Sequence, residues 1–478
     1  MKAKLFLFIS YLLLLILLFS TLESSLNVFI SFIVNAIVLT LITYYHIFVE
    51  KKFSPFLSSF IVFNILFFLV APIIQINSFS IDNNRFATNF IYREDLVLFT
   101  NFLIFLFNIS FVTTYLFLKK LKTKKNIYKQ GNKKTLRVAI FVILILSIFV
   151  FVGSLSFLMA ELSRPNWMES TYSVSTLLIW KKVLFLLPFA GIILCVQYFK
   201  NKKPGSKKAL EILCYLTLFF ILLFWFKNPL TEKRNALGPI YISLIFLFIP
   251  RLLNTNIKTL SFLFFSMIVL FPLTAVLTHT DASFEEIVNK PSVLLEKNKG
   301  GSLTSTFETL NYDAFSNVMA TVDYTDHHQL SYGYQSLSAF LFFIPRDIWE
   351  NKPNTTGKLI GEYLIADYDF KFDNLSNPIV SEGYINFGIL GVIIAAIFLA
   401  CVFKLMDNWL SHEDFLYKVM AFYFAIHLIF LLRGDFTNGF SYYIGTLGGV
   451  IVLPKIIQYF IRQAFTKTKR NNEFGENL

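Results

Sequence analysis

The 478-residue sequence has little charge, few cysteines and no glycine-rich phosphate-binding motif. Only 15% of its residues are Asp, Glu, Lys or Arg, whereas soluble domains carry about 25%. The three cysteines, Cys195, Cys214 and Cys401, all lie in apolar segments. This placement excludes a disulfide framework or a zinc site in the polar part of the chain. The low charge excludes an ordinary soluble domain.

Apolar residues dominate the chain instead. They make up 55% of the sequence, which includes 58 Phe, and the mean hydropathy is +0.61. A membrane-spanning helix needs about 20 mainly apolar residues. The sequence predicts an all-α integral membrane protein with about twelve such helices, at Leu5–Thr21, Leu26–His46, Pro55–Ile76, Leu96–Leu118, Val138–Phe157, Val183–Phe199, Leu210–Phe226, Leu237–Leu253, Leu260–Leu277, Tyr384–Phe403, Phe415–Leu432 and Tyr442–Phe460.

The basic residues predict the orientation of these spans. Residues 119–137 hold nine Lys or Arg and no acid, and residues 200–208 hold five and none. Such clusters favour the cytoplasmic side of a membrane. With both termini in the cytoplasm, every basic cluster falls on that side. The net charge of +13 is therefore explained by topology, and we expect no nucleic acid partner.

One long polar segment interrupts the apolar pattern. Residues 280–383 contain fifteen Asp or Glu and seven Lys or Arg, and the predicted topology places them outside the cytoplasm. The domain organisation expected is a membrane domain of about nine spans (1–279), this large extracytoplasmic loop (280–383), three final spans (384–462) and a cytoplasmic tail (463–478). Apolar residues recur here at helical spacing, which predicts an amphipathic helix packed on the spans: Leu303, Phe307, Leu310, Phe315, Val318 and Met319.

A membrane enzyme whose active face lies outside the cytoplasm must use donors attached to lipid, because nucleotide sugars are absent there. The head of such a donor is a pyrophosphate, which arginine binds through two parallel hydrogen bonds. The candidates are Arg346, Arg433 and Arg234. Each has an alternative role as an anchor for lipid headgroups or as half of a surface ion pair.

Glycosyl transfer also needs a base that takes the proton of the acceptor hydroxyl. Glu382 and Asp435 both stand at predicted membrane edges, where burial raises a carboxyl pKa. Asp435 has an alternative role as the partner of Arg433, and Glu382 as an acid at a helix N-terminus. His427 is expected to be a packing residue. Asp367 and Asp369 form a weak metal-ligand pattern, and we expect no metal and no cofactor.

The segment from Phe343 to Pro353, together with Gly357 and the segment Glu382–Gly391, resembles the bacterial O-antigen and capsule repeat-unit polymerases of the Wzy type. The resemblance implies a fold similar to the membrane portion of the GT-C glycosyltransferases, with one large outer loop before the last three spans. It implies polymerisation of undecaprenyl-pyrophosphate-linked oligosaccharides at the outer face of the cytoplasmic membrane. Arg346, Arg433 and Arg234 then correspond to the recurrent outer arginines of the family, and Lys352 joins them as a pyrophosphate-binding candidate.

The partners expected are the lipid-linked oligosaccharide, the bilayer and a chain-length regulator protein. Two other functions remain open. An O-antigen ligase, or another lipid-linked glycosyltransferase, would share the architecture, although the 343–353 text favours the polymerase. A polysaccharide flippase would need a charged path through the spans and no dominant outer loop, which is the reverse of this sequence.

Overall fold

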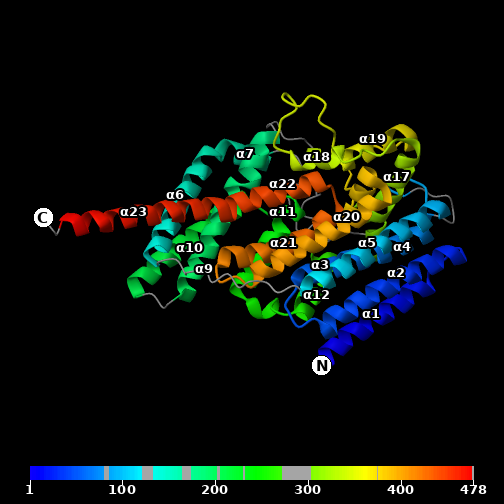
Figure 1. The fold of residues 1–478 in the computed structure, drawn as a ribbon, viewed down its shortest axis with the longest axis horizontal. Helices are drawn as coiled ribbons and strands as arrows, with labels where there is room; N and C mark the ends of the chain where they lie inside the picture. The colour runs from blue at the N-terminus through cyan, green and yellow to red at the C-terminus, as the bar shows by residue number, and fades with distance from the viewer. Residues whose placement is uncertain are drawn as a thin grey trace, which may run out of the picture.

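The computed structural model describes residues 1–79, 86–120, 133–163, 174–201, 205–229, 232–271, 303–373 and 375–475. Within these ranges every regular element is a helix (Figure 1). The first part of the chain forms α1 (Lys2–Ser20), α2 (Leu26–Tyr44), α3 (Pro55–Ile65), α4 (Ala71–Phe79), α5 (Glu94–Lys120), α6 (Lys133–Gly153), α7 (Leu155–Ser163), α8 (Val174–Lys182), α9 (Leu187–Asn201), α10 (Ser206–Phe226), α11 (Arg234–Phe248) and α12 (Asn256–Phe265).

The second part begins at residue 303. It forms α16 (Leu303–Phe307), α17 (Ala314–His327), α18 (Tyr334–Phe340), α19 (Thr356–Tyr368), α20 (Ile379–Leu410), α21 (Phe415–Arg433), α22 (Phe436–Leu447) and α23 (Leu453–Gly475). Short 3₁₀ or π-helical turns join or extend several helices, at Tyr45–Val49, Leu66–Val70, Leu184–Leu186, Pro250–Leu252, Ser266–Leu270, Leu310–Tyr312 and Gly448–Val452.

In the described residues, ten helices are long and apolar enough to cross a membrane. They confirm the multi-pass, all-helical membrane protein that the sequence predicts, in the regions of ten of the twelve expected spans. The other two, Leu237–Leu253 and Leu260–Leu277, correspond to shorter apolar helices at Arg234–Phe248 and Asn256–Leu270. The first ends early because a 3₁₀ turn follows at Pro250, where the fixed ring of proline and its missing N–H interrupt the helix. Residues 272–277 lie outside the described residues.

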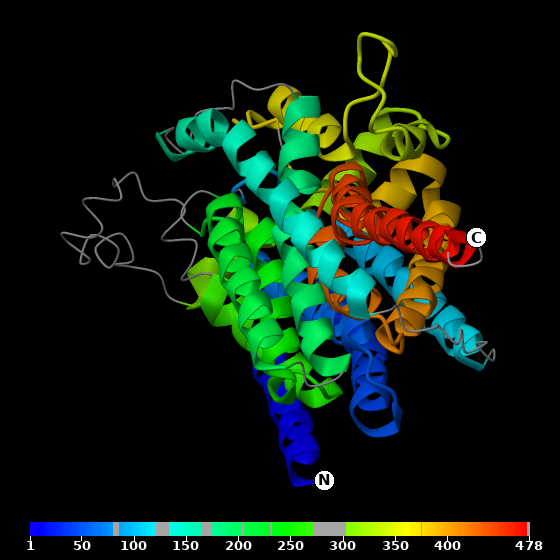
Figure 2. The same cartoon turned by 90° about the vertical axis from the view of Figure 1, so that its left-hand side faces the viewer.

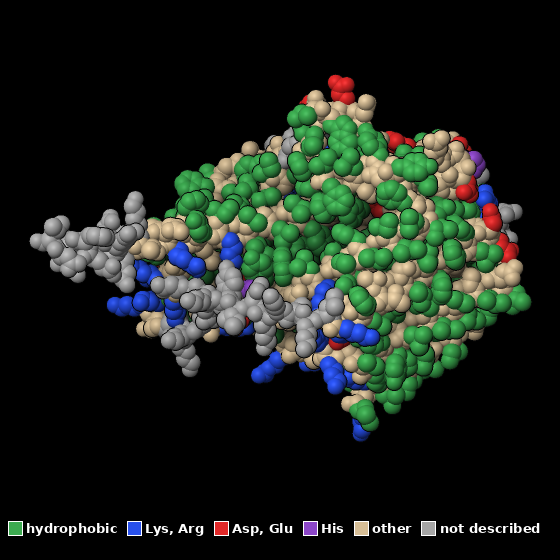
Figure 3. All heavy atoms as spheres, viewed as in Figure 1, with side chains coloured by type: hydrophobic (Ala, Val, Ile, Leu, Met, Phe, Trp, Pro, Cys, Tyr) green, Lys and Arg blue, Asp and Glu red, His purple; other side chains and the backbone are tan. Residues whose placement is uncertain are grey.

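The bundle is centred on α3 and α21. In α3 and its continuation to Phe79, 94% of the most apolar window is buried, whereas in α1 the value is 17%. The outward faces of α1, α6 and α10 carry many exposed Leu, Ile and Phe side chains. Figure 2 shows α6, α9 and α10 side by side, and apolar side chains cover much of the surface in Figure 3. Continuous apolar surface of this extent is suited to lipid rather than water.

Charge separates the two ends of the bundle. In Figure 3, Lys and Arg gather towards the lower left and Asp and Glu towards the top and right. At the lower end, which we call the basic end, Lys119 pairs with Glu50 and Lys455 with Asp414. At the opposite end, Ser25 donates to Glu94 over 2.6 Å. Loops predicted to share one side of the membrane therefore meet each other.

Residues 303–378, which we call the cap, cover the end opposite the basic end. Phe315, Val318 and Met319 of α17 are fully buried, so this helix packs against the rest of the protein as predicted. It is not amphipathic over this stretch, because every residue from Ala314 to Asp323 is buried. The expected helix is not continuous, because a 3₁₀ turn at Leu310–Tyr312 separates α16 from α17. Asp323 of α17 fixes α19, since it accepts hydrogen bonds from Tyr363 (2.7 Å) and Tyr368 (2.6 Å).

Helix α20 is broken near its start. Phe387 and Gly388 leave the helical conformation, and Gly388 has φ 59° and ψ −142°. A Cβ on Gly391 would lie 1.9 Å from the carbonyl oxygen of Gly383, although residues eight apart in a straight helix are separated by about 12 Å. The chain therefore folds back on itself here, so the predicted span Tyr384–Phe403 begins with a break rather than as one continuous helix.

The cap supplies part of the hydrogen bonding at this break. The Ser331 N–H donates to the Ile385 carbonyl over 2.9 Å, and the Asn386 amide donates to the Glu382 carbonyl over 2.7 Å. The Ser336 N–H donates to the Asn386 side chain over 3.2 Å. The short helix 379–386 is thereby fixed between the cap and the bundle.

Candidate functional site

Two carboxyl groups that are 53 residues apart in the chain meet where the cap joins the bundle. Glu382 lies in the first turn of α20 and Asp435 is the N-cap residue of α22. Their residues are 8% and 5% exposed. The Glu382 carboxylate accepts a hydrogen bond from the Thr356 hydroxyl over 2.5 Å and one from the Phe436 N–H over 2.8 Å. The two base candidates predicted from the sequence thus belong to one site.

Asp435 is held in an unusual conformation. Its φ of 29° lies in a region that residues with a Cβ seldom adopt. Its carboxylate accepts from the Asn438 N–H over 3.2 Å, and it also interacts with the Thr355 side chain and the Gly357 N–H. Burial raises the pKa of Asp435, while these hydrogen bonds act in the opposite direction. Backbone strain held in place by hydrogen bonds is common at functional sites.

Gly357 is required by close approach. A Cβ at this position would lie 2.0 Å from the Leu375 carbonyl oxygen and 3.3 Å from Oδ2 of Asp435. The absent side chain therefore lets the start of α19 pack directly against the carboxyl pair. The fold therefore gives a structural reason for Gly357, which the sequence identifies only as part of the resemblance.

Lys182 is the neighbouring cation, and sequence reasoning missed it. Its Nζ donates to the Ser441 hydroxyl over 2.5 Å and lies 4.1 Å from the centre of the Tyr442 ring. Asp435 interacts electrostatically with both Lys182 and Glu382. The cation offsets part of the repulsion between the two carboxyl groups. In the sequence Lys182 ends a predicted outer loop, and only the fold brings it beside a residue 253 positions later.

Two predicted arginines form a second cluster on residues 310–313 of the cap. Arg433 Nη2 donates to the Leu310 carbonyl over 2.6 Å and to Asp313 over 3.1 Å. Arg234 donates to the Phe271 carbonyl over 2.9 Å and to the Asn311 side chain over 3.1 Å. The two guanidinium groups interact electrostatically, so the fold brings like charges together.

Asp313 is the acid that pairs with this cluster. Burial raises the pKa of Asp313, and the charge of Arg433 acts to lower it. The alternative that Asp435 pairs with Arg433 is therefore wrong, because the ion pair of Arg433 is with Asp313. Within the described residues, Nε of Arg433 is buried and has no hydrogen-bond partner. A buried donor without a partner is costly, and here it lies two residues from Asp435.

Arg346 and Lys352 lie in the loop after α18 and are not brought into the arginine cluster. Arg346 donates to the Lys352 carbonyl over 2.5 Å and to the Asn354 side chain over 2.8 Å. Lys352 donates to the carbonyls of Phe342 and Ile344, over 2.9 and 2.8 Å. Burial and then the charge of Arg346 lower the pKa of Lys352. Both cations thus close their own loop, which projects from the cap in Figures 1 and 2 and leads directly into Thr355 and Thr356.

His427 packs among aromatic rings. It is 2% exposed, and its ring centre lies 5.4 Å from that of Tyr442 and 5.2 Å from that of Tyr443. Within the described residues neither ring nitrogen has a hydrogen-bond partner. The interpretation as a packing residue agrees with this position, although its polar atoms are not satisfied.

Asp367 and Asp369 lie in the last turn and at the C-cap of α19. In the described part of the chain, no group of three or more His, Cys, Asp and Glu side chains gathers as a metal-ligand set. The side chains of this site offer a buried carboxyl pair that can take a proton and nearby guanidinium groups that can bind an anion.

Comparison of the chain with protein-family models, with curated proteins and with solved structures found no match.

Proposed function

We propose that this protein is a Wzy-type membrane glycosyltransferase that polymerises undecaprenyl-pyrophosphate-linked oligosaccharide units into O-antigen or capsular polysaccharide. The observation that carries the proposal is the buried pair Glu382–Asp435 beside the cluster of Arg433 and Arg234. Transfer of a sugar from a pyrophosphate donor requires both a proton acceptor and a group that stabilises the departing anion. The resemblance of the 343–353 and 382–391 text to these polymerases supports the same reaction.

In this reaction the hydroxyl oxygen of a new repeat unit attacks the anomeric carbon that joins the growing polymer to its carrier. A carbon–oxygen bond forms there, and the bond from the same carbon to the pyrophosphate oxygen breaks. The electron pair leaves with undecaprenyl pyrophosphate. Glu382 accepts the hydroxyl proton, and Asp435 and Lys182 position the Glu382 carboxylate and tune its charge.

The arginine cluster stabilises the leaving pyrophosphate. Arg433 is bound on one side by Leu310 and Asp313, which fixes its guanidinium plane, and its buried Nε has no hydrogen-bond partner within the described residues. A fixed, planar donor that cannot lose its proton suits a developing phosphate charge. Arg346 and Lys352 act as positioning residues, because their donors hold the loop that precedes Thr355 and Thr356.

The orientation is part of the proposal. The basic end faces the cytoplasm, as the distribution of Lys and Arg favours, and the cap faces outwards. The carboxyl pair then lies at the outer membrane surface, where a lipid-linked donor presents its head. The membrane is the cytoplasmic membrane of a bacterium.

The test is a deletion strain of the source bacterium complemented with variants. We expect the deletion to leave surface lipid that carries single repeat units, because export and ligation still proceed. Glu382→Gln should reproduce this phenotype at normal protein level, because an amide keeps the shape of the side chain but accepts no proton. Loss of a positioned base lowers the rate about 10²–10⁴-fold. Glu362→Gln is the matched control, because the Glu362 side chain is 45% exposed and the amide oxygen of glutamine can still accept the hydrogen bond from Asn354.

The phenotype of the deletion strain also distinguishes the other functions. Polymer stranded on its lipid carrier would identify a ligase, and single units trapped on the cytoplasmic face would identify a flippase. A normal polymer ladder from Glu382→Gln would transfer the role of base to Asp435.

A further inference from the structure

One edge of the cap is apolar and exposed. Residues 337–344, which form the end of α18 and the start of the loop after it, carry no charge. Leu337 is 47% exposed, Phe340 45% and Phe343 65%. Figure 3 shows hydrophobic side chains over this part of the cap and acidic ones only at the projecting end of the loop. Eight residues are too few to span a membrane, so this surface is not a further span.

The exposed edge is continuous with the lipid-facing surface of the bundle. The Phe340 ring centre lies 5.8 Å from that of Phe436 and 5.2 Å from that of Phe440, both in α22. The Phe436 ring centre lies 6.2 Å from that of Phe398 in α20. Phe398 is 41% exposed, and Ile394, one turn earlier on the same face, is 49% exposed. Ring contacts therefore join the edge of the cap to the part of α20 that faces lipid.

The length of α20 gives the depth of its break. Lys404 belongs to the basic end, where it interacts electrostatically with Lys119. It follows Gly388 by 16 residues, which corresponds to about 24 Å of helix. The hydrocarbon of a bilayer is about 30 Å thick, and a tilted helix covers even less of that thickness. With Lys404 at one edge of the hydrocarbon, the break at Gly388 lies inside the other edge.

Helix α18 begins at the level of this break. The Ser331 N–H, just before α18, donates to the Ile385 carbonyl over 2.9 Å. The Ser336 N–H, in the first turn of α18, donates to the Asn386 side chain over 3.2 Å. These two bonds fix the start of α18 against the residues before the break. Leu337 directly follows Ser336, so its exposed side chain lies at the depth of the hydrocarbon.

Lys352 makes the backbone of the loop compatible with this depth. Its Nζ donates to three loop carbonyls, over 3.3, 2.9 and 2.8 Å: those of Leu341, Phe342 and Ile344. A backbone carbonyl without a partner is costly in hydrocarbon, whereas water satisfies the carbonyls of an exposed loop. A buried ammonium group that serves three carbonyls therefore suits a loop that lies in lipid.

Aromatic and polar groups mark the outer limit of the apolar edge. The Tyr334 and Trp349 rings meet edge to face with their centres 5.9 Å apart, and the Tyr334 hydroxyl donates to the Asn351 carbonyl over 2.6 Å. Tyr and Trp are enriched where the hydrocarbon meets the headgroups. Arg346 and Glu350, in the same part of the loop, are exposed.

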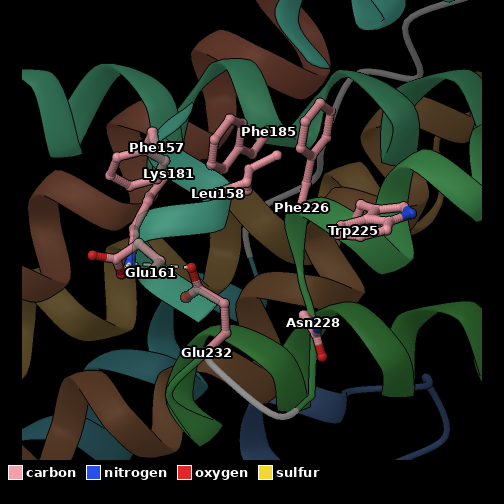
Figure 4. A pocket seen from close by; sticks show the side chains of 9 residues that line it. All are labelled: Phe157, Leu158, Glu161, Lys181, Phe185, Trp225, Phe226, Asn228 and Glu232. Carbon is pink, nitrogen blue, oxygen red and sulfur yellow. Dashed lines mark hydrogen bonds and ion pairs between the residues drawn. The ribbon is translucent and has the colours of Figure 1, made fainter. Parts of the chain in front are cut away.

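Elsewhere at the cap end, the edge of the bundle is charged. Between α7, α8 and α10, Lys181 lies 2.7 Å from Glu161 and 3.4 Å from Glu232 (Figure 4). Glu232 comes shortly after the end of α10 at Phe226, so charge follows the apolar helix closely there. Residues 337–344 have no such groups, which indicates that lipid rather than water borders the cap at α18.

We propose that α18 and residues 341–344 are embedded in the hydrocarbon of the bilayer leaflet that borders the cap, with residues 346–351 at its surface. The acyl chains of that leaflet then cover the exposed edge. The proposal holds for either orientation of the protein and does not depend on the polymerase function.

Spin labels on the full-length protein test this proposal. Cys214 and Cys401, which are exposed, are replaced by alanine, and a single labelled cysteine is introduced as Leu337→Cys or Phe343→Cys. The protein is placed in lipid nanodiscs that hold one copy each. Collisions of the label with oxygen, which dissolves in lipid, are compared with collisions with a water-soluble nickel chelate. We expect both labels to meet oxygen often and nickel rarely, as Ile394→Cys does on the lipid-facing side of α20.

Ile365→Cys is the matched control within the cap. Ile365 is 40% exposed on α19, and Glu362 and Asp367 on the same helix are exposed too, so its label should meet nickel often and oxygen rarely. Labels at residues 337 and 343 that both behave like the one at residue 365 would overturn the proposal. Labels open to nickel in single-copy discs but protected in two-copy discs would assign the edge to a second copy instead. Protection only in membranes of the source bacterium would assign it to a partner protein, which also overturns the proposal.

Discussion

Asp435 and Glu382 illustrate what can be predicted at the scale of single residues. Each was identified from its place at a membrane edge, but no sequence pattern places residues 53 positions apart in contact. The sequence does not predict a role for Thr356 or Lys182, because neither belongs to a recognisable functional motif. Lys182 is simply one of two adjacent lysines before a predicted span. Arg346 is a pyrophosphate-binding candidate in the sequence, whereas its hydrogen bonds close its own loop. Residue type predicts chemistry, and only the fold selects which groups meet.

The pH dependence of transfer should report the carboxyl pair. Asp435→Asn keeps the helix cap, because asparagine is as good an N-cap as aspartate, and it removes one negative charge beside Glu382. Burial raises the pKa of Asp435, so in the wild type both charges are present only above the usual carboxyl range. We expect the rising limb of the pH–rate profile to move to lower pH by about one unit in the variant. The measurement is polymerisation by purified protein at graded pH.

Asp347→Asn is the control, because Asp347 is exposed in the loop after α18 and its charge does not reach the pair. An unchanged profile in Asp435→Asn would mean that the two carboxyl groups titrate independently. A variant inactive at every pH would instead make Asp435 the group that takes the proton.

Arg433 should not be replaceable by lysine. Lysine keeps the charge but cannot provide the planar guanidinium that binds both Leu310 and Asp313. We expect Arg433→Lys to lower polymerisation about 10²-fold, the usual cost of one lost transition-state donor. The measurement is the polymer ladder, with protein abundance determined in parallel.

A double variant separates catalysis from folding. Arg433→Gln leaves the buried charge of Asp313 unpaired, so it should lower abundance as well as polymer. Asp313→Asn/Arg433→Gln should recover abundance without recovering polymer. Arg93→Lys is the matched control, because Arg93 pairs with Asp323 elsewhere in the cap. Full-length polymer from Arg433→Lys would leave headgroup anchoring as the better account of this residue.

At the scale of elements, α20 shows that hydropathy predicts where a span lies but not whether its helix is broken. Its apolar composition is continuous from Ile379 to Leu410, and nothing in that composition reveals a chain that folds back at Gly388. The glycines of the 382–391 run were noted as motif residues. Their physical role is the close approach of Gly383 and Gly391. The same limitation explains α11 and α12, whose composition suggested two full spans.

Gly388→Ala tests the break. The φ of 59° with ψ of −142° is nearly restricted to glycine, and forcing another residue into it costs about 1–3 kcal/mol. We expect a lower thermal unfolding temperature and loss of polymer, because Glu382 lies on the short helix before the break. The measurement is thermal unfolding in detergent together with the ladder.

Gly448→Ala is the control for this substitution. Gly448 is helical, and its added Cβ would meet only Val183 at 3.9 Å, an ordinary contact. Equal stability of both variants would show that the break tolerates a side chain and does not depend on glycine.

At the scale of the whole molecule, the sequence predicts which loops lie at the same end, because the Lys and Arg clusters can be counted loop by loop. The side of the membrane on which each end lies is tested by reporter fusions. An enzyme active only outside the cytoplasm should work when fused near Asn311 or Asn354 and fail near Lys125 or Lys203, the last two of which lie outside the described residues. The Lys and Arg distribution predicts this pattern. Activity at Lys125 would reverse the orientation and refute the mechanism.

The fold-back in α20 has a consequence for how the molecule unfolds. From the cap, the Ser331 N–H donates to the Ile385 carbonyl and the Ser336 N–H donates to the Asn386 side chain. Two ion pairs, Arg93–Asp323 and Arg433–Asp313, tie the cap to the start of α5 and the end of α21. A region joined at so many points has no low-energy opening of its own, since local unfolding follows regions with few buried contacts. We therefore expect the cap and the bundle to unfold as one cooperative unit. The carboxyl pair at their junction should keep its geometry until the whole protein unfolds.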